Sequence, residues 1–290
     1  MAHEIFKVIA IMAYADTLPK QRGFGETTRP DAWWLQPLVV FLGFSAFIVY
    51  STWAGFQGVA DLKTGHCTYW YGGHGANYLS PFYSPEFWGI SPHAMGRLPA
   101  WWPAWAPFSP AFLISWVPAG FRFTCYYYRG AYYKSFWADP SNCAVGEPRK
   151  SYLGERFFPL VIQNIHRYFM YLAVLFIFLL AYDAWLGMWF TGADGKEHFG
   201  IGVGTLVLSL NAVFLALYTF GCHSLRHLVG GYLDSKSKAP ACAKTYSCVS
   251  CLNHKHMMWA WISLFWVGFT DVYIRLCVAG HLTDYIFFKI

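Results

Sequence analysis

The chain has 290 residues, of which 21% are aromatic and only 12% are charged, and its formal net charge is +6 at pH 7. So few charges exclude an ordinary soluble domain of this length and favour a protein that crosses a membrane several times. The positive charge does not indicate nucleic-acid binding, because the basic residues are scattered over short loops rather than gathered on one face.

The N-terminal arm, residues 1–34, precedes the first long apolar segment and contains a short apolar run from Phe6 to Ala15. Glu4 interrupts the basic start that a secretory signal needs, and the apolar run is minimal. We therefore expect this arm to form an interfacial helix that lies on the membrane.

Five segments are long and apolar enough to cross a hydrocarbon core of about 30 Å as helices. They lie near residues 36–60, 108–130, 160–190, 202–227 and 257–283. The predicted fold is therefore all-α, a polytopic bundle of five transmembrane helices that forms a single membrane domain over residues 1–290. In the fifth segment Asp271 and Arg275 are four residues apart, a spacing at which the two charges can pair within the membrane.

The basic residues outside these segments are distributed unevenly between the two sides of the membrane. Fourteen lie in the N-terminal arm and in the loops after the second and fourth segments, whereas four lie on the opposite side. Because cytoplasmic loops carry the excess of Lys and Arg, we expect a cytoplasmic N-terminus and a C-terminus outside.

This topology places six of the eight cysteines on the reducing, cytoplasmic side. They are Cys125, Cys143, Cys222, Cys242, Cys248 and Cys251. Cysteines on a reducing face are more often thiolate ligands than disulfide partners.

The fourth segment closes on the sequence Gly-Cys-His-Ser-Leu-Arg-His-Leu, residues 221–228. His223 and His227 are four residues apart and lie on one helical face, with Cys222 and Arg226 on an adjacent face. Imidazoles in a membrane helix are costly, so this pattern is typical of a ligand site.

The tripeptide Arg226-His227-Leu228 resembles the haem-ligand signature of succinate dehydrogenase cytochrome b subunits, in which the His after the Arg is the axial ligand. The chain is most similar to the single-subunit, five-helix succinate dehydrogenase anchors of actinobacterial type. The segments that carry this similarity are 123–129 (FTCYYYR), 163–169 (QNIHRYF), 222–227, and His256-Met257 with Ala260-Trp261-Ile262.

This resemblance implies the membrane anchor of a succinate:quinone oxidoreductase, respiratory complex II of the tricarboxylic acid cycle, in a bacterial plasma membrane. On this interpretation the chain has no succinate site and no catalytic residue of its own. It docks a flavoprotein subunit and an iron-sulfur subunit on its basic cytoplasmic face and passes electrons to a quinone, with menaquinone implied by the family. A higher oligomer of the complex is a further expectation.

In this branch of the family a membrane-embedded Rieske-type [2Fe–2S] cluster is implied in place of haem. Such a cluster needs two thiolates on one iron and two imidazoles on the other. With the resemblance as guide, Cys125 and Cys143 are the expected thiolates and His166 is one expected imidazole. Either His227 or His223 would complete the set.

A quinone pocket is expected near the same leaflet, because Arg, His and Tyr donors can bind quinone carbonyls while aromatic walls hold the ring. The predicted quinone contacts are Tyr127, Arg226, His256 and Trp259.

Three alternatives remain open from the sequence. A haem b anchor would use His166 together with His227 or His223 as axial ligands. The Cys248-x-x-Cys251 pair, with Cys242, His254 and His256 nearby, has the spacing of a small structural zinc site. A transporter is disfavoured because few polar residues lie at depth in the predicted helices.

Overall fold

The computed structural model describes residues 23–149, 156–158, 160–231 and 238–290. Most of the predicted interfacial arm, residues 1–22, lies outside the described residues. The chain divides into two compact units: residues 1–43 with 128–160, and residues 44–127 with 161–290. We refer to these as unit 1 and unit 2 and describe each by itself.

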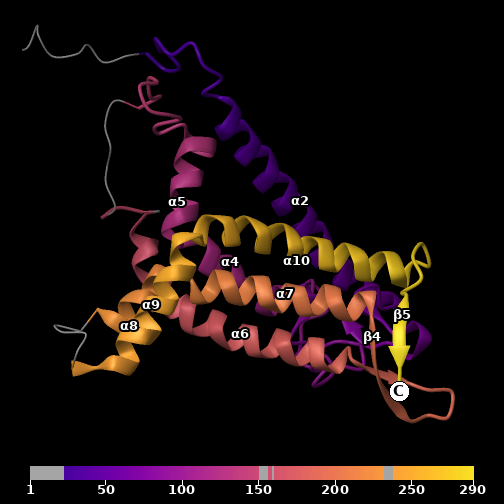
Figure 1. Ribbon diagram of the computed structural model, residues 1–290. Coiled ribbons are helices and arrows are strands. Elements are labelled where there is room, and N and C mark those ends of the chain that lie inside the picture. The colour runs from indigo at the N-terminus through magenta and orange to yellow at the C-terminus, as the bar shows by residue number, and fades with distance from the viewer. Residues whose placement is uncertain (1–22, 150–155, 159, 232–237) are drawn as a thin grey trace, which may run out of the picture. The chain divides into compact units, whose positions relative to one another are not determined.

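Three long helices form the body of unit 2: α6 (His166–Leu186), α7 (Val203–Phe220) and α10 (His256–Val278). Helix α7 packs against both α6 and α10, and the three run side by side (Figure 1). Helix α6 is preceded by a 3-10 turn, η4 (Leu160–Ile165). Helix α10 ends just before Gly280, whose positive φ of 75° permits the left-handed turn that commonly stops a helix.

Four helical stretches in the described parts of the chain are long and apolar enough to span a membrane. They are Leu35–Thr64 (helix α2), Leu160–Leu186, Val203–Phe220 and His256–Val278. Each corresponds to a predicted segment, so the all-α, polytopic class is confirmed. The fourth prediction was too long, because α7 stops at Phe220 and a separate helix, α8 (His223–Gly230), begins after Cys222.

The second predicted span, 108–130, is not a continuous helix, and this prediction is corrected. It consists of α3 (Pro110–Ile114), α4 (Trp116–Phe123) and α5 (Tyr126–Tyr132). Pro118 cannot donate an amide hydrogen bond to the carbonyl of Ile114, and its ring crowds that carbonyl. The helix therefore breaks after Ile114. A second break follows at Thr124, whose hydroxyl donates to the carbonyl of Gly120 at 2.7 Å.

One end of unit 2 is closed by short strands. Strands β1 (Trp70–Tyr71) and β2 (Tyr78–Leu79) pair antiparallel, with η1 (Gly73–Gly75) between them and η2 (Pro81–Tyr83) after them. Strands β3 (Trp189–Thr191), β4 (Glu197–Gly202) and β5 (Ile286–Lys289) form an antiparallel sheet in the order β3-β4-β5. We call this the strand end of unit 2.

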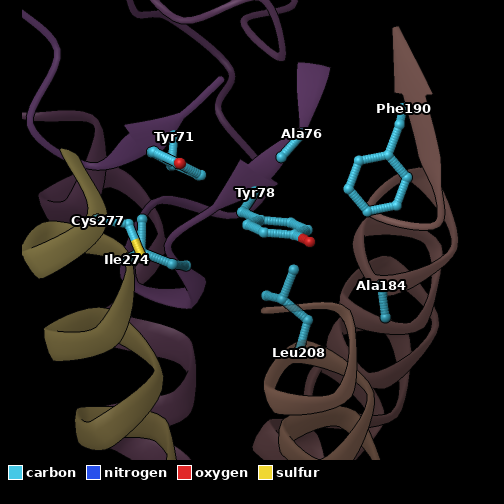
Figure 2. Packing of buried hydrophobic residues seen from close by; sticks show 8 residues of the cluster. All are labelled: Tyr71, Ala76, Tyr78, Ala184, Phe190, Leu208, Ile274 and Cys277. Atoms are coloured by element: carbon cyan, nitrogen blue, oxygen red, sulfur yellow. The ribbon is translucent and has the colours of Figure 1, made fainter. Parts of the chain in front are cut away.

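The strand end has its own buried core of aromatic and aliphatic side chains. Figure 2 shows Tyr78 at its centre, with Ile274 and Cys277 of α10 on one side and Phe190 of β3 on the other. A Cβ atom at Gly204 would lie 2.2 Å from the Tyr78 ring, so the glycine is what lets β2 pack directly on α7. This packing ties the strands to the ends of the helices.

The predicted pairing of Asp271 with Arg275 is present in α10. The Nε atom of Arg275 donates to Asp271 Oδ2 at 2.8 Å, and the Asp271 side chain is fully buried. Tyr50 of α2 donates to the same carboxylate oxygen at 2.5 Å, and Ser80 donates to the other. The ion pair therefore joins α10 to α2 and to the strand end.

The opposite end of unit 2 carries a helical hairpin of α8 and α9 (Pro240–His254). Arg226 of α8 donates to Ser250 Oγ at 3.0 Å and to the hydroxyl of Tyr246 at 2.8 Å, both on α9. Helix α8 also packs on α6, and α9 packs on α7. The hairpin therefore closes the end at which α6 and α10 begin and α7 stops.

Unit 1 contains the first part of α2, most of α5, and a five-residue π-helical turn, η3 (Tyr133–Trp137). Arg29 joins its two chain segments by donating to Asn142 Oδ1 at 3.0 Å and to the carbonyl of Cys143 at 3.1 Å. The backbone amides of Gly25 and Gly146 complete the link, because each donates a hydrogen bond to a carbonyl of the other chain segment.

Candidate metal centre and adjacent cavity

Four sulfur and nitrogen donors meet at the hairpin end of unit 2. Cys125 follows the break after α4, His166 is the first residue of α6, Cys222 lies between α7 and α8, and His256 is the first residue of α10. Both thiols are buried, with exposed fractions of 3% for Cys125 and 1% for Cys222. We call these four residues the Cys/His quartet.

His166 is held in a defined orientation. The Thr124 hydroxyl donates its proton to the Gly120 carbonyl, so it must accept from the Nδ1–H group of His166, which lies 2.8 Å away. The unprotonated Nε2 then faces Cys222 Sγ at 3.1 Å. Phe121 stacks on the ring, with centroids 4.8 Å apart. A second-shell hydrogen bond that fixes the tautomer in this way is typical of a metal-binding histidine.

His256 occupies the other side of the quartet. Its Nε2 lies 3.7 Å from Cys125 Sγ, and its Nδ1 is buried and has no hydrogen-bond partner among the described residues. Tyr218 of α7 stacks on the ring, with centroids 4.9 Å apart. A buried nitrogen left without a partner is costly unless something else binds it.

The quartet also brings like donors together. Burial raises the pKa of the Cys222 thiol to about 11, and the nearby Cys125 thiol contributes to the same rise. His256 lies within electrostatic range of His166. The two sulfurs, and likewise the two imidazoles, therefore lie within electrostatic range of each other.

The quartet does not have the form of a site for a single metal ion. Across the described ranges, no group of three or more His, Cys, Asp or Glu side chains is arranged to hold one ion. A [2Fe–2S] cluster makes a different demand, because each iron takes only two protein ligands and the two inorganic sulfides supply the rest. Two thiols and two imidazoles fit that demand in number and type.

The other predicted ligands lie outside the quartet. Cys143 is exposed and belongs to unit 1, whereas Cys125 belongs to unit 2. His223 and His227 are exposed on α8, and His227 Nδ1 lies 3.1 Å from Arg167 Nη2. The structure brings Cys222 and His256 together with Cys125 and His166, whereas the ligand roles of Cys143, His223 and His227 stay predictions. The quoted family segments contained both Cys222 and His256, but the spacing within one segment could not select them.

The Cys248 and Cys251 thiols are exposed on α9. Residues three apart lie on one helical face, so this pair could supply two ligands. No third His, Cys, Asp or Glu joins them among the residues with described placement. The predicted zinc site therefore has no complete ligand set in this part of the structure.

An apolar cavity of about 450 Å³ lies in unit 2 beside the quartet. Phe121 and Tyr218, whose rings stack on His166 and His256, both line it. From α6 the lining includes Ala173, Ile177 and Leu180. The cavity therefore extends from the quartet along α6 toward the strand end.

Arg122 is the charged side chain that lines this cavity. Its guanidinium donates to the carbonyl of Ala260 at 3.1 Å and to Ser263 Oγ at 2.9 Å. Its Cζ atom lies 4.7 Å from the centroid of the Tyr218 ring. A cation held in an apolar cavity beside a phenol is suited to orient a ligand with carbonyl oxygens.

The four residues predicted to contact quinone lie elsewhere and are not among those lining the cavity. Arg226 is engaged by Ser250 and Tyr246 of α9. The Tyr127 hydroxyl accepts a hydrogen bond from Trp261 Nε1, and Trp259 lies near Phe214. His256 belongs to the quartet, and sequence reasoning did not single out Arg122 or Tyr218.

Comparison with known proteins supplies the family. The sequence model of the actinobacterial succinate dehydrogenase subunit SdhC matches residues 35–280. The chain belongs to this family. It also resembles a chain of the Mycobacterium smegmatis Sdh1 complex in the apo form, with 39% identity and a TM-score of 0.79 over 93% of this chain and 97% of that chain. No curated protein matches.

Membership of the SdhC family establishes this chain as a membrane-anchor subunit of succinate dehydrogenase. The four candidate spans agree with a multi-pass membrane protein. The Cys/His quartet and the apolar cavity are therefore features of the membrane subunit of a quinone oxidoreductase.

Proposed function

We propose that this subunit carries electrons from water-soluble succinate dehydrogenase subunits to a quinone, through a Rieske-type [2Fe–2S] cluster held by Cys125, Cys222, His166 and His256. The observation that carries the proposal is that two aromatic rings lie between the quartet and the cavity. Phe121 and Tyr218 each touch one imidazole of the quartet and the wall of the cavity.

The cluster, when bound, would supply one-electron transfer in a dry environment. The two thiolates would hold one iron and the two imidazoles the other. Thr124 orients His166 through its Nδ1–H group, and burial of both cysteines excludes water from the sulfurs. These features would stabilise the bonds between the ligands and iron and would influence the reduction potential of the cluster.

The apolar cavity is the proposed site of the quinone ring. Arg122 would orient a carbonyl oxygen of the ring, and aromatic and aliphatic side chains would surround its faces. Phe121 and Tyr218 would lie between the quinone and the cluster ligands. Menaquinone stays a prediction from the family.

The proposed partners are a flavoprotein subunit and an iron-sulfur subunit, as expected for this family, and the matched chain likewise belongs to a complex. They would dock at the hairpin end, where Lys244 lies on α9 and Lys238 and Lys255 flank this helix. This orientation makes the hairpin end cytoplasmic, in agreement with the distribution of basic residues. A cytoplasmic reporter that is active when fused after Ile290 would contradict it.

The haem b alternative finds less support in the geometry. His166 Nε2 faces the Cys222 sulfur at 3.1 Å, so the described residue nearest to that nitrogen is a thiol and not the second imidazole that a bis-histidine haem needs. His227, the proposed second axial ligand, is exposed and contacts Arg167.

The test is to purify the whole complex with His166→Ala or His256→Ala in this subunit, with His227→Ala as the matched control. Each quartet variant should lose about two iron atoms and two acid-labile sulfides per complex, as one [2Fe–2S] cluster contains. It should also lose the paramagnetic resonance signal with a low average g value and most succinate-to-quinone activity. Succinate oxidation with a water-soluble acceptor should persist.

An unchanged signal in both quartet variants, or its loss in His227→Ala alone, would show that the ligands are wrong. A strong α band in the optical spectrum of the dithionite-reduced wild-type complex would favour haem instead.

A further inference from the structure

The strand end of unit 2 buries a carboxyl and an imidazole that the electron route does not use. Asp183 lies in the last turn of α6, and its side chain is 10% exposed. The Ser84 hydroxyl donates to its Oδ2, and His93 Nδ1 lies 3.9 Å from its Oδ1. The His93 side chain is 6% exposed. Ionisable residues at such depth are expensive and are usually retained for function.

The tautomer of His93 follows from its neighbours. Trp70 Nε1 donates to Asn77 Oδ1 at 2.8 Å, and His93 Nε2 lies 2.6 Å from the same oxygen. An oxygen accepts both bonds, so His93 carries its proton on Nε2 and turns the Nδ1 lone pair toward Asp183. Burial lowers the pKa of His93, which keeps this lone pair available near neutral pH. The ring can therefore exchange a proton with Asp183, directly or through one water.

A second cavity, of about 490 Å³, lies beside this pair. Its lining includes Asn77, which binds His93, and Pro92, which precedes it in the chain. It also includes Glu197 of β4, which is exposed. The lining of this cavity therefore includes both the partner of His93 and a side chain exposed to solvent at the strand end.

One face of α6 links the pair to the apolar cavity and to the quartet. His166 starts the helix, Ala173, Ile177 and Leu180 line the cavity, and Asp183 follows Leu180 by three residues, on the same face. The 17 residues between His166 and Asp183 correspond to about 26 Å of helix. Along α6, His166 and Asp183 therefore lie on either side of the residues that line the cavity.

The other charged groups of the strand end have different partners. Asp271 is bound by Arg275, Tyr50 and Ser80. Glu86 accepts from the hydroxyls of Tyr69 and Ser91. Asp183 differs from these two carboxyls because a neutral imidazole lies beside it, and this ring can take up and return a proton.

We propose that Asp183, together with His93, delivers protons to quinone in the apolar cavity from the membrane face opposite the cluster. The inference rests on the proposed function. Reduction of a quinone to a quinol consumes two electrons and two protons. The electrons arrive from the quartet, and each proton leaves the Asp183 carboxyl and passes through water along the cavity to a quinone oxygen. Water in the second cavity then returns a proton to the carboxylate through His93.

The experiment uses the purified whole complex with Asp183→Asn or His93→Gln, and Asp194→Asn on the exposed β3–β4 turn as control. Loss of a proton-donating group typically costs about a hundredfold or more in rate. Asp183→Asn should therefore reduce a menaquinone analogue about a hundredfold more slowly, with a larger solvent isotope effect in D2O. Added azide, a small weak acid, should restore part of the rate, which a merely structural role of Asp183 would not allow.

The cluster signal and succinate oxidation with a water-soluble acceptor should be unchanged in Asp183→Asn. If Asp183→Asn does not assemble, the rate of quinone reduction by His93→Gln becomes the test. Asp183→Glu, which keeps a carboxyl, should retain quinone reduction. Full quinone reduction by Asp183→Asn, or by His93→Gln where Asp183→Asn does not assemble, would overturn the proposal. Absence of a cluster signal from the wild-type complex would instead contradict the proposed function.

A second measurement locates the proton source. Wild-type complex in liposomes with a trapped pH dye should make the compartment facing the strand end more alkaline during quinone reduction. Alkalinisation of the compartment facing the hairpin end by quinol formation would contradict the proposed route.

Discussion

The Nε2 atom of His166 lies 3.1 Å from the Sγ atom of Cys222, although 56 residues separate them in the chain. The contact forms because α6 begins at the same end of unit 2 at which α7 stops. Thr124 holds the ring from its other nitrogen. The imidazole is therefore presented to the thiol in a single orientation before any metal arrives.

Cys222→Ser should abolish the proposed cluster, because a hydroxyl at this position is a far weaker iron ligand than a thiolate. The matched control is Cys248→Ser, which changes an exposed thiol on α9. Iron and sulfide analysis of the purified complex, with paramagnetic resonance, compares the two. Equal cluster content in both variants would exclude Cys222 as a ligand.

Thr124→Val should retain the cluster in altered form. It removes the oxygen that accepts from His166 Nδ1–H and keeps the shape of the side chain. Loss of an outer-shell partner typically costs 10- to 100-fold in metal affinity or activity. Redox titration should show a shifted potential in Thr124→Val and a near-normal one in Thr124→Ser. Identical titrations for all three proteins would mean that this hydrogen bond does not act on the site.

Arg122→Leu should raise the KM for quinone about tenfold, which corresponds to about 1.4 kcal/mol of binding free energy. The reason is the loss of the cationic donor that lines the apolar cavity. Arg226→Leu is the matched control, because Arg226 binds α9 and is not among the residues lining the cavity. Steady-state kinetics with a soluble quinone measures the KM of both variants. A larger increase in KM for Arg226→Leu would place the quinone site at α8 and α9 instead.

Asp271→Asn should destabilise the subunit by about 3–5 kcal/mol, because it leaves Arg275 as an uncompensated buried charge. The double variant Asp271→Asn with Arg275→Leu should be milder, since no charge then remains. Thermal stability and yield of the assembled complex give the comparison. A double variant that assembles no better than either single variant would mean that the hydrogen bonds from Tyr50 and Ser80 matter more than the ion pair.

Cys67 should react slowly with maleimide near neutral pH. Burial raises the pKa of its thiol to about 11, and the thiolate is the reactive form. Labelling should therefore become about tenfold faster for each unit of pH until pH approaches 11. Mass spectrometry of the labelled complex can compare Cys67 with the exposed Cys143. Rapid labelling of Cys67 at pH 7 would show that it is accessible and ionised.

The long helices were predictable because each depends on one continuous stretch of sequence. An apolar run of about 20 residues in lipid must satisfy its own backbone hydrogen bonds, and a helix does so locally. Helices α2, α6, α7 and α10 follow from that rule. Residues 108–130 satisfied the same composition, but the crowding of Pro118 against the Ile114 carbonyl and the hydroxyl of Thr124 divided them.

The sequence alone determined the class of the protein, its spanning helices and the segments that contribute donors to the quartet. Only the tertiary structure decided which donors meet. The spacing of His223 and His227 describes one helix, whereas a ligand set depends on distances between helices. Because α7 stops before Cys222 and α8 starts a separate helix, Cys222 turns inward and His227 lies exposed beside Arg167. His256 joins the quartet because α10 begins where α7 ends, a relation that no single segment contains.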